Sequence, residues 1–222
     1  MRFRTGIKLA LVLSLIGLAA ATPSRARAEV KAFRLLPPTA TVDGRSRAQL
    51  LVTGYTAKVL SKVAIETSNC ADRPQFGETA GAKTIAGRVF TLPAQLGRTL
   101  TCTMSATSIL MIDHIGVICN DGKNREASVE CIEKRFEPVK EFRVTFDGID
   151  LGAARFRIIT EKFVVDLPND SPFGLHRGKW RLRAGGWPIL LSEVTPGRHV
   201  VETSYKLGKN RQTAIVNLTV VR

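Results

Sequence analysis

The residues that could act as a general base in catalysis are the three histidines, His114, His176 and His199. A serine or cysteine nucleophile needs such a base within hydrogen-bond reach, and the base needs a group that orients it. Asp113 precedes His114, but neighbours on a strand point to opposite faces, so we do not expect this pair to act together. The chain also lacks the Gly-x-Ser-x-Gly elbow of many hydrolases.

The other two histidines have simpler interpretations. His199 follows a Pro-Gly turn, and we expect it to be half-buried and to bond a loop carbonyl. His176 lies near Asp166 and Asp170, in a segment that we expect to be an exposed loop. The sequence contains no Gly-rich phosphate loop, dinucleotide fingerprint or calcium loop. We therefore predict no catalytic residue, no cofactor and no enzymatic activity.

The four cysteines are Cys70, Cys102, Cys119 and Cys131. An even count is typical of disulfides in an oxidising compartment, and the N-terminal segment described below predicts export. Three pairings are possible. Turn-forming residues separate Cys119 from Cys131, so we favour this pair as the clasp of a hairpin, and Cys70 with Cys102 follows by elimination. A metal site is the alternative, but there is no Cys-x-x-Cys and no His at finger-like spacing, so we assign no metal ligand.

The candidate binding residues are the densest group of cations and the two tryptophans, namely Arg177, Lys179, Arg181, Arg183, Trp180 and Trp187. Alternation places the four cations on one face of an extended strand, with Trp180 on the other face. A solvated strand face is the simplest interpretation. The sharper hypothesis is an anion-binding surface for lipid head groups, polyanionic glycans or an acidic protein. For the two tryptophans, the alternative to this hypothesis is that both indoles are core residues.

Residues 1–28 have the pattern of a cleaved signal peptide. Basic residues precede an apolar run from Leu9 to Ala21, and the small-residue triplet Ala26-Arg27-Ala28 follows. We predict cleavage after Ala28, with cleavage after Ala21 as the alternative. A run of about 13 residues is too short for a stable spanning helix, which needs about 20, so we expect no transmembrane anchor after cleavage. The expected location is periplasmic or secreted.

The formal charge of the chain is +14 and its pI is about 10.2. Removal of residues 1–28 takes away five basic residues and no acid, which leaves +9. Lys and Arg are scattered along the rest of the chain, whereas a nucleic-acid-binding protein concentrates them in a patch. We expect no nucleic-acid partner.

Short runs of alternating or β-branched residues predict strands, and Gly, Pro, Asn and Asp punctuate them. The first series is Ala48–Thr53, Lys58–Glu66, Gly87–Leu92, Thr99–Met104, Ile109–Ile112, Gly116–Cys119 and Ser128–Cys131. The second is Glu141–Phe146, Ala154–Thr160, Lys162–Leu167, Lys179–Arg183, Ile189–Leu191, Arg198–Tyr205 and Thr213–Val221. Only the stretch 57–65 also fits a helical face. The Asp147-Gly148 pair predicts a tight hairpin.

The fold class that this pattern predicts is all-β, with two β-sandwich-like modules. All cysteines precede the segment Lys134–Pro138 and both tryptophans follow it, so we place a disulfide-containing β module at 29–137 and a second module at 138–222. The alternative is one sandwich whose sheets share strands from both halves.

The second half carries turn and strand motifs at Asp147-Gly148, Phe163 to Asp170, Gly185-Gly186-Trp187, Pro196 to His199 and Asn217 to Val220. In these motifs the segment from Phe142 to Val220 resembles uncharacterised exported bacterial β-sandwich proteins. The resemblance implies an immunoglobulin-like second module and no assigned reaction. The chain departs from that pattern between its last two strands, where it has only the short basic loop from Lys206 to Arg211.

These observations predict an exported, non-enzymatic binding or structural protein of the bacterial envelope that recognises anionic glycans or protein partners. Two alternatives stay open. One is a secreted hydrolase whose site has no recognised motif. The other is a subunit of an adhesive or secretion assembly, which an unpaired edge strand would indicate.

Overall fold

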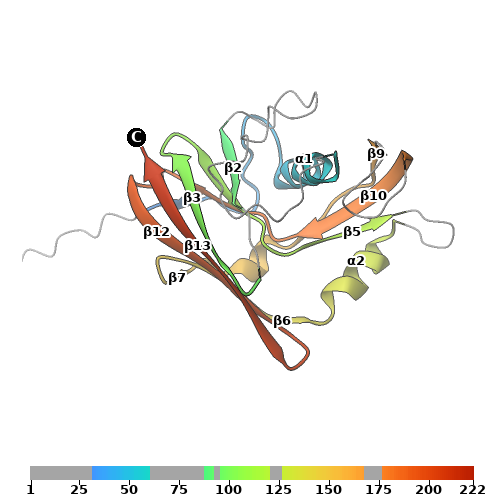
Figure 1. Ribbon diagram of the computed structural model, residues 1–222. Helices are drawn as coiled ribbons and strands as arrows, with labels where there is room; N and C mark the ends of the chain where they lie inside the picture. Colours follow the sequence, from blue (N-terminus) through green and yellow to red (C-terminus); the bar gives the residue numbers. More distant parts are fainter. Residues whose placement is uncertain (1–31, 61–87, 93–95, 121–126, 168–176) are drawn as a thin grey trace, which may run out of the picture. The chain divides into compact units, whose positions relative to one another are not determined.

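The computed structural model describes residues 32–60, 88–92, 96–120, 127–167 and 177–222, without the side chains of 57–60. Strands dominate this part of the chain, so the fold is all-β (Figure 1). Its helical elements are α1 (Arg47–Leu60), α2 (Val129–Phe136) and the short 3-10 helix η2 (Ala153–Phe156). The segment with the signal-peptide pattern, Cys70 and His176 lie outside the described residues.

The first of three sheets has four strands in the order β1-β11-β4-β2. Their bounds are Arg34–Leu35 for β1, Ile189–Ser192 for β11, Ile109–Ile112 for β4 and Val89–Leu92 for β2. The apolar runs Ile189–Leu191 and Ile109–Ile112 are buried almost throughout, which explains why they do not alternate with polar residues.

The second sheet has strand β10 (Gly178–Gly186) at its centre. It pairs antiparallel with β5 on one side, and with β8 and β9 on the other. Their bounds are Gly116–Asn120 for β5, Ile158–Ile159 for β8 and Phe163–Leu167 for β9.

The third sheet has five strands in the order β3-β13-β12-β6-β7. Their bounds are Thr99–Ser105 for β3, Asn210–Val221 for β13, Gly197–Leu207 for β12, Val139–Phe146 for β6 and Ile149–Asp150 for β7. The predicted Asp147-Gly148 hairpin between β6 and β7 is confirmed. Both turn residues have positive φ, as the type I′ turn of a two-residue hairpin requires.

The largest core cluster combines residues of the first and third sheets. Leu110, Ile112 and Ile189 come from the first sheet, and Phe146 and Val216 from the third. Each of these five side chains is at most 1% exposed. Alternate residues of β12 and β13 therefore face this core, while the residues between them face outward.

Two strand predictions were wrong because residues that start a helix precede or begin those segments. Ala48–Thr53 lies in α1, where Ser46 and Gln49 form a reciprocal capping box: the Ser46 N–H donates to Gln49 Oε1 at 2.8 Å, and the Gln49 N–H to Ser46 Oγ at 3.3 Å. Lys58 to Leu60, the first residues of the predicted strand Lys58–Glu66, also lie in α1, and the rest of that segment lies outside the described residues. Ser128–Cys131 forms the start of α2, because the Ser128 hydroxyl caps the Cys131 N–H at 3.1 Å. The segment Ala154–Thr160 is likewise η2 followed by only two residues of strand.

The sheets do not divide at residue 137. Strands β11, β10 and β13 of the second half pair with β4, β5 and β3 of the first. Residues Lys31–Arg222 form one compact unit. The arrangement found is therefore the alternative, in which sheets share strands from both halves, and the modules expected at 29–137 and 138–222 are not separate.

Candidate functional site

The predicted binding residues lie on and beside β10, and the strand register sorts them between its two faces. Lys179 lies opposite Asp166, and Arg181 opposite Val164, on β9. Arg183 lies opposite Cys119 on β5. Residues directly opposite in an antiparallel pair share a face, so these side chains define one face of the sheet. Trp180, Leu182 and Ala184 occupy the other.

The face with Trp180 is covered by protein. Leu51 and Tyr55 of α1 form a buried cluster with Ala184, and Trp180 packs on the cluster of Leu182 with strand β9. Burial raises the pKa of the Tyr55 hydroxyl well above its ordinary value, and the Asp113 carboxylate adds to this effect. Trp180 therefore does not belong to the surface that carries the cations.

The cationic face is open at the start of β10. Arg177, Lys179 and Arg181 are exposed, and within the described part of the chain none of them forms an ion pair. Alternate residues of a strand are about 6.6–6.8 Å apart, so the two cations on β10 form the beginning of a regular row. We call Arg177, Lys179 and Arg181 the basic row. Asp166, also exposed, is the acid that lies on this face of β9.

Arg183, the fourth predicted cation, is instead a structural residue. Its side chain is 13% exposed. Its Nε donates to the carbonyl of Ala127 at 3.0 Å and its Nη1 to that of Thr160 at 2.8 Å, while Glu161 lies 4.0 Å away. These bonds tie the segment before α2 and the segment before β9 to β10.

Trp187 does not join the basic row either. It is 7% exposed, and its ring centroid lies 4.4 Å from that of Phe136 and 4.7 Å from that of Phe142. The surface predicted from both tryptophans and the cations is therefore not assembled, because one indole is a core residue and the other faces α1.

Helix α2 covers the last residues of β10, on the strand face that carries Lys179 and Arg181. A Cβ on Gly185 would lie 2.5 Å from Ile132 Cγ2 and 2.7 Å from Phe136 Cε2, so only glycine permits this approach. The disulfide between Cys119 and Cys131 fixes the helix to β5, with an S–S distance of 1.99 Å. The predicted pairing is confirmed, but the bond joins a strand to a helix instead of clasping a hairpin. Cys102 is disulfide-bonded as well, and its expected partner Cys70 lies outside the described residues.

Within the described part of the chain, His199 and His114 both lie within hydrogen-bond distance of protein groups. His199 is 7% exposed; its Nδ1 lies 2.7 Å from Asp147 Oδ2 and its Nε2 2.7 Å from the carbonyl oxygen of Thr195. The expectation that it bonds a loop carbonyl is thus confirmed, and both of its nitrogens are engaged. Nδ1 of His114 lies 2.7 Å from the Thr203 hydroxyl, which is fully buried.

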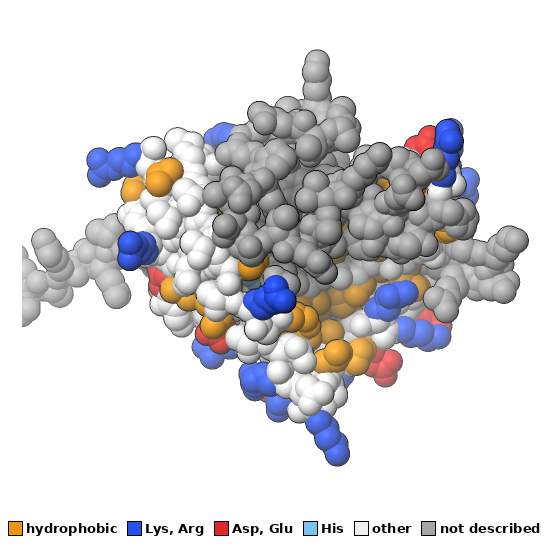
Figure 2. Space-filling model, viewed as in Figure 1, with side chains coloured by type: hydrophobic (Ala, Val, Ile, Leu, Met, Phe, Trp, Pro, Cys, Tyr) orange, Lys and Arg blue, Asp and Glu red, His pale blue; other side chains and the backbone are white. Residues whose placement is uncertain are grey.

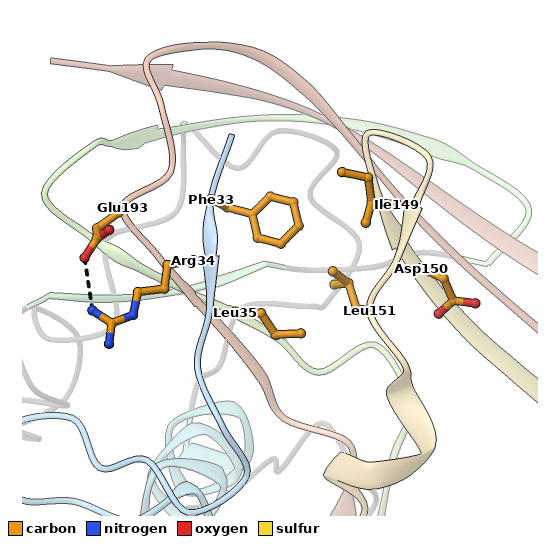
Figure 3. A pocket seen from close by; sticks show the side chains of 7 residues that line it. All are labelled: Phe33, Arg34, Leu35, Ile149, Asp150, Leu151 and Glu193. Carbon is orange, nitrogen blue, oxygen red and sulfur yellow. Dashed lines mark hydrogen bonds and ion pairs between the residues drawn. The ribbon is translucent and has the colours of Figure 1, made fainter. Parts of the chain in front are cut away.

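A separate apolar pocket of about 490 Å³ lies between the edge strands β1 and β7 (Figure 3). Phe33, Leu35, Ile149 and Leu151 gather in it, while Arg34 turns to its ion pair with Glu193. Phe33 also packs edge-on against Phe146 at 4.8 Å, which connects the pocket to the main core. Such a site can hold an apolar side chain, and the sequence analysis did not single out its residues.

The residue that sets the position of β1 was also missed. Arg47 is 3% exposed and donates to four backbone carbonyl groups, those of Leu36, Pro37, Pro38 and Pro188. Its guanidinium lies 4.8 Å from the centroid of the Phe156 ring. Burial, together with the nearby Arg155 guanidinium, lowers the pKa of Arg47 to about 10. A cation in the first turn of a helix interacts unfavourably with the helix dipole. This unfavourable position was the feature of the sequence that could have indicated a structural role for Arg47.

Lys and Arg side chains lie at separate points of the surface visible in Figure 2 and do not form one block, with some of them over the end where Figure 1 places β9 and β10. In the described ranges, no group of three His, Cys, Asp or Glu residues could hold a metal ion. Neither described helix is long and apolar enough to cross a membrane.

Comparisons with known proteins give no relative from which a function could be transferred. No family model matches the chain, and no curated protein matches it. Among solved structures, the solution structure of amebosin is similar with 12% identity, over 60% of this chain and 98% of that chain, at a TM-score of 0.24. A likeness at this level supports no argument about fold or function.

Proposed function

We propose that this protein is a non-enzymatic binding protein that is exported to the periplasm or secreted, and that it holds an anionic partner on the basic row. The observation that carries the proposal is the basic row: Lys179 and Arg181 are exposed alternate residues of one strand face, Arg177 is exposed directly before that strand, and none of the three has an ion-pair partner among the described residues. Some cations elsewhere in the described chain are ion-paired, as Lys206 and Arg211 are with Glu141, whereas Arg98, Arg198 and Lys209 are exposed without such a pair.

Several features support a surface that binds a partner without catalysing a reaction. Lys179 and Arg181 of the basic row lie on a strand whose register at these positions is held by β9, so their spacing is fixed before a partner binds. Binding to preorganised charges costs less conformational entropy than binding to a flexible tail. The hydrolase alternative gains no support from His199, because this side chain is buried and both of its nitrogens lie within hydrogen-bond distance of protein oxygens.

The disulfide and the N-terminal sequence support an exported location. Disulfides persist in oxidising compartments, and Cys119 with Cys131 forms one. The pattern of residues 1–28 is that of a signal peptide, which delivers a chain to such a compartment.

The test compares a variant that lacks the three charges of the basic row with a variant that lacks three charges elsewhere on the surface. The Arg177→Gln, Lys179→Gln, Arg181→Gln variant is measured against an Arg98→Gln, Arg198→Gln, Lys209→Gln variant, whose three cations are exposed and make no ion pair with described residues. The probe is fluorescent dextran sulfate, with uncharged dextran as the neutral control. Because exposed charges act over about one Debye length, roughly 10 Å at 0.1 M salt, position matters as well as number.

We expect the basic-row variant to lose at least tenfold in affinity for dextran sulfate, and the control variant to lose less than twofold. Raising the salt concentration should weaken the wild type more than the basic-row variant. Equal losses in the two variants would show that net charge alone governs binding and would refute a defined site.

A further inference from the structure

The face that carries the basic row also carries an exposed aliphatic side chain. Val164 on β9 lies directly opposite Arg181 and is 62% exposed, the highest value among the exposed large hydrophobic residues of the described structure. A valine side chain in this position forms no hydrogen bond with water and leaves apolar surface exposed to the solvent. Cations beside an exposed aliphatic residue are the combination that lies favourably at a membrane interface.

The same face has no aromatic side chain among the described residues of β9 and β10. Trp180 lies on the opposite face, and Phe163, two residues from Val165, packs with the buried side of the sheet. Trp187 is in the core. A neutral sugar ring would need an aromatic face to stack on or a hollow lined with hydrogen-bonding groups, and this face supplies no aromatic side chain among its described residues. The apolar pocket between β1 and β7 is lined by no residue of the basic row.

We infer that the anionic partner is the surface of a phospholipid bilayer with acidic head groups. This inference rests on the proposed function, because it identifies the partner of the basic row. The cations lie against the lipid phosphates, and Val164 enters the interface between head groups and acyl chains. Asp166, opposite Lys179, opposes binding and keeps the net charge of the face low. Attachment is therefore reversible and depends on both salt and the acidic lipid.

The experiment measures cosedimentation of the chain without the predicted signal peptide, residues 29–222, with two kinds of vesicle, one of phosphatidylcholine and one of phosphatidylcholine with phosphatidylglycerol. We expect binding to the acidic vesicles only. Each neutralised cation of the basic row should lower partitioning about fivefold, since each basic residue near an acidic membrane contributes a similar increment. Inorganic phosphate in excess serves as a competitor that carries the charge without the bilayer.

Val164→Ser separates this inference from the proposed function. We expect the variant to lose at least threefold in partitioning to acidic vesicles and to bind dextran sulfate like the wild type. Val200→Ser is the matched control, because Val200 is 44% exposed on β12, away from β10. Both positions are exposed strand residues, and thermal unfolding checks that each variant is folded.

The outcomes are distinct. Binding to dextran sulfate without binding to acidic vesicles overturns the membrane inference and leaves the proposed function standing. Vesicle binding that Val164→Ser does not alter also overturns it, because the surface then recognises charge alone. Displacement by inorganic phosphate at the ionic strength of the control buffer contradicts a bilayer partner. Failure to bind either probe refutes both proposals.

Discussion

At the scale of single residues, position decides whether a charged side chain binds a partner or holds the fold. Arg181 and Arg183 are two residues apart on the same face of β10. Arg181 is exposed, whereas Arg183 donates to two backbone carbonyls and is 13% exposed. The difference arises because the segments before α2 and β9 converge on Arg183. The spacing of residues along a strand predicts which side chains share a face. It does not predict which of those side chains the rest of the chain covers.

Arg47 provides the clearest prediction at this scale. Arg47→Met keeps most of the apolar stem and removes the donor to four buried or half-buried carbonyls. Hydrogen bonds to a charged group are worth about 1.5–3 kcal/mol, and orphaned carbonyls add a penalty, so we expect a loss of about 2–4 kcal/mol in the free energy of unfolding. Urea unfolding measures it.

The matched control is Arg45→Met, since Arg45 is half-buried and its described bonds use only its backbone. We expect this change to cost less than about 0.5 kcal/mol, as for most surface substitutions. If both variants unfold at the same urea concentration, Arg47 does not anchor β1.

At the scale of elements, α2 covers the Gly185 end of β10. It buries Ile132 and Phe136 against Gly185 and Trp187, and the disulfide of Cys119 and Cys131 holds it to β5. The helix has Glu130 in its first turn and Lys134 and Arg135 in its last, which complements the helix dipole. An eight-residue helix is nevertheless too short to be stable alone, so its position depends on these tertiary contacts.

The double variant Cys119→Ala, Cys131→Ala tests this dependence without affecting Cys102. For a sequence separation of 12 residues, the chain-entropy model gives a loss of about 3 kcal/mol in the free energy of unfolding. We also expect faster hydrogen exchange in α2 than in the wild type, with β12 and β13 unchanged below the unfolding transition. An unchanged urea midpoint together with unchanged exchange in α2 would contradict this account.

Most strands could be predicted from the sequence, because alternation or a short apolar run between turn residues reports burial on one or both faces. Ile109–Ile112 was predicted with its observed bounds. The two helices were missed because their apolar residues also fit a strand, and the decisive signals were the polar caps Ser46 and Ser128.

Of the candidate site, the shared face of the cations was predictable from alternation. A core position for Trp187 was one of the two interpretations of the sequence, but its partners Phe136 and Phe142 could not be named, since the sequence does not specify how their elements pack.

At the scale of the whole described unit, the pairing of distant strands explains why the boundary expected at residue 137 is absent. Strand β3 pairs in parallel with β13, over a register that runs from Thr99 with Ile215 to Ser105 with Val221. Parallel pairing between elements so far apart in the sequence leaves no local signal, unlike a hairpin. The same mixing places β5, from the first half, beside β10, from the second. The sheet that carries the basic row therefore contains strands from both halves of the chain, although Lys179 and Arg181 of the row pair with β9 of the second half.

The central claim, that an anionic partner lies on the basic row, is tested most directly by chemical labelling of lysines with an amine-reactive acetate ester. Lys179, in the row, and Lys209, in the turn between β12 and β13, are both exposed. We predict that acidic vesicles or dextran sulfate slow the labelling of Lys179 at least fivefold and leave that of Lys209 unchanged. Equal protection of the two lysines, or labelling of Lys179 at its free rate while the partner is bound, would contradict the account.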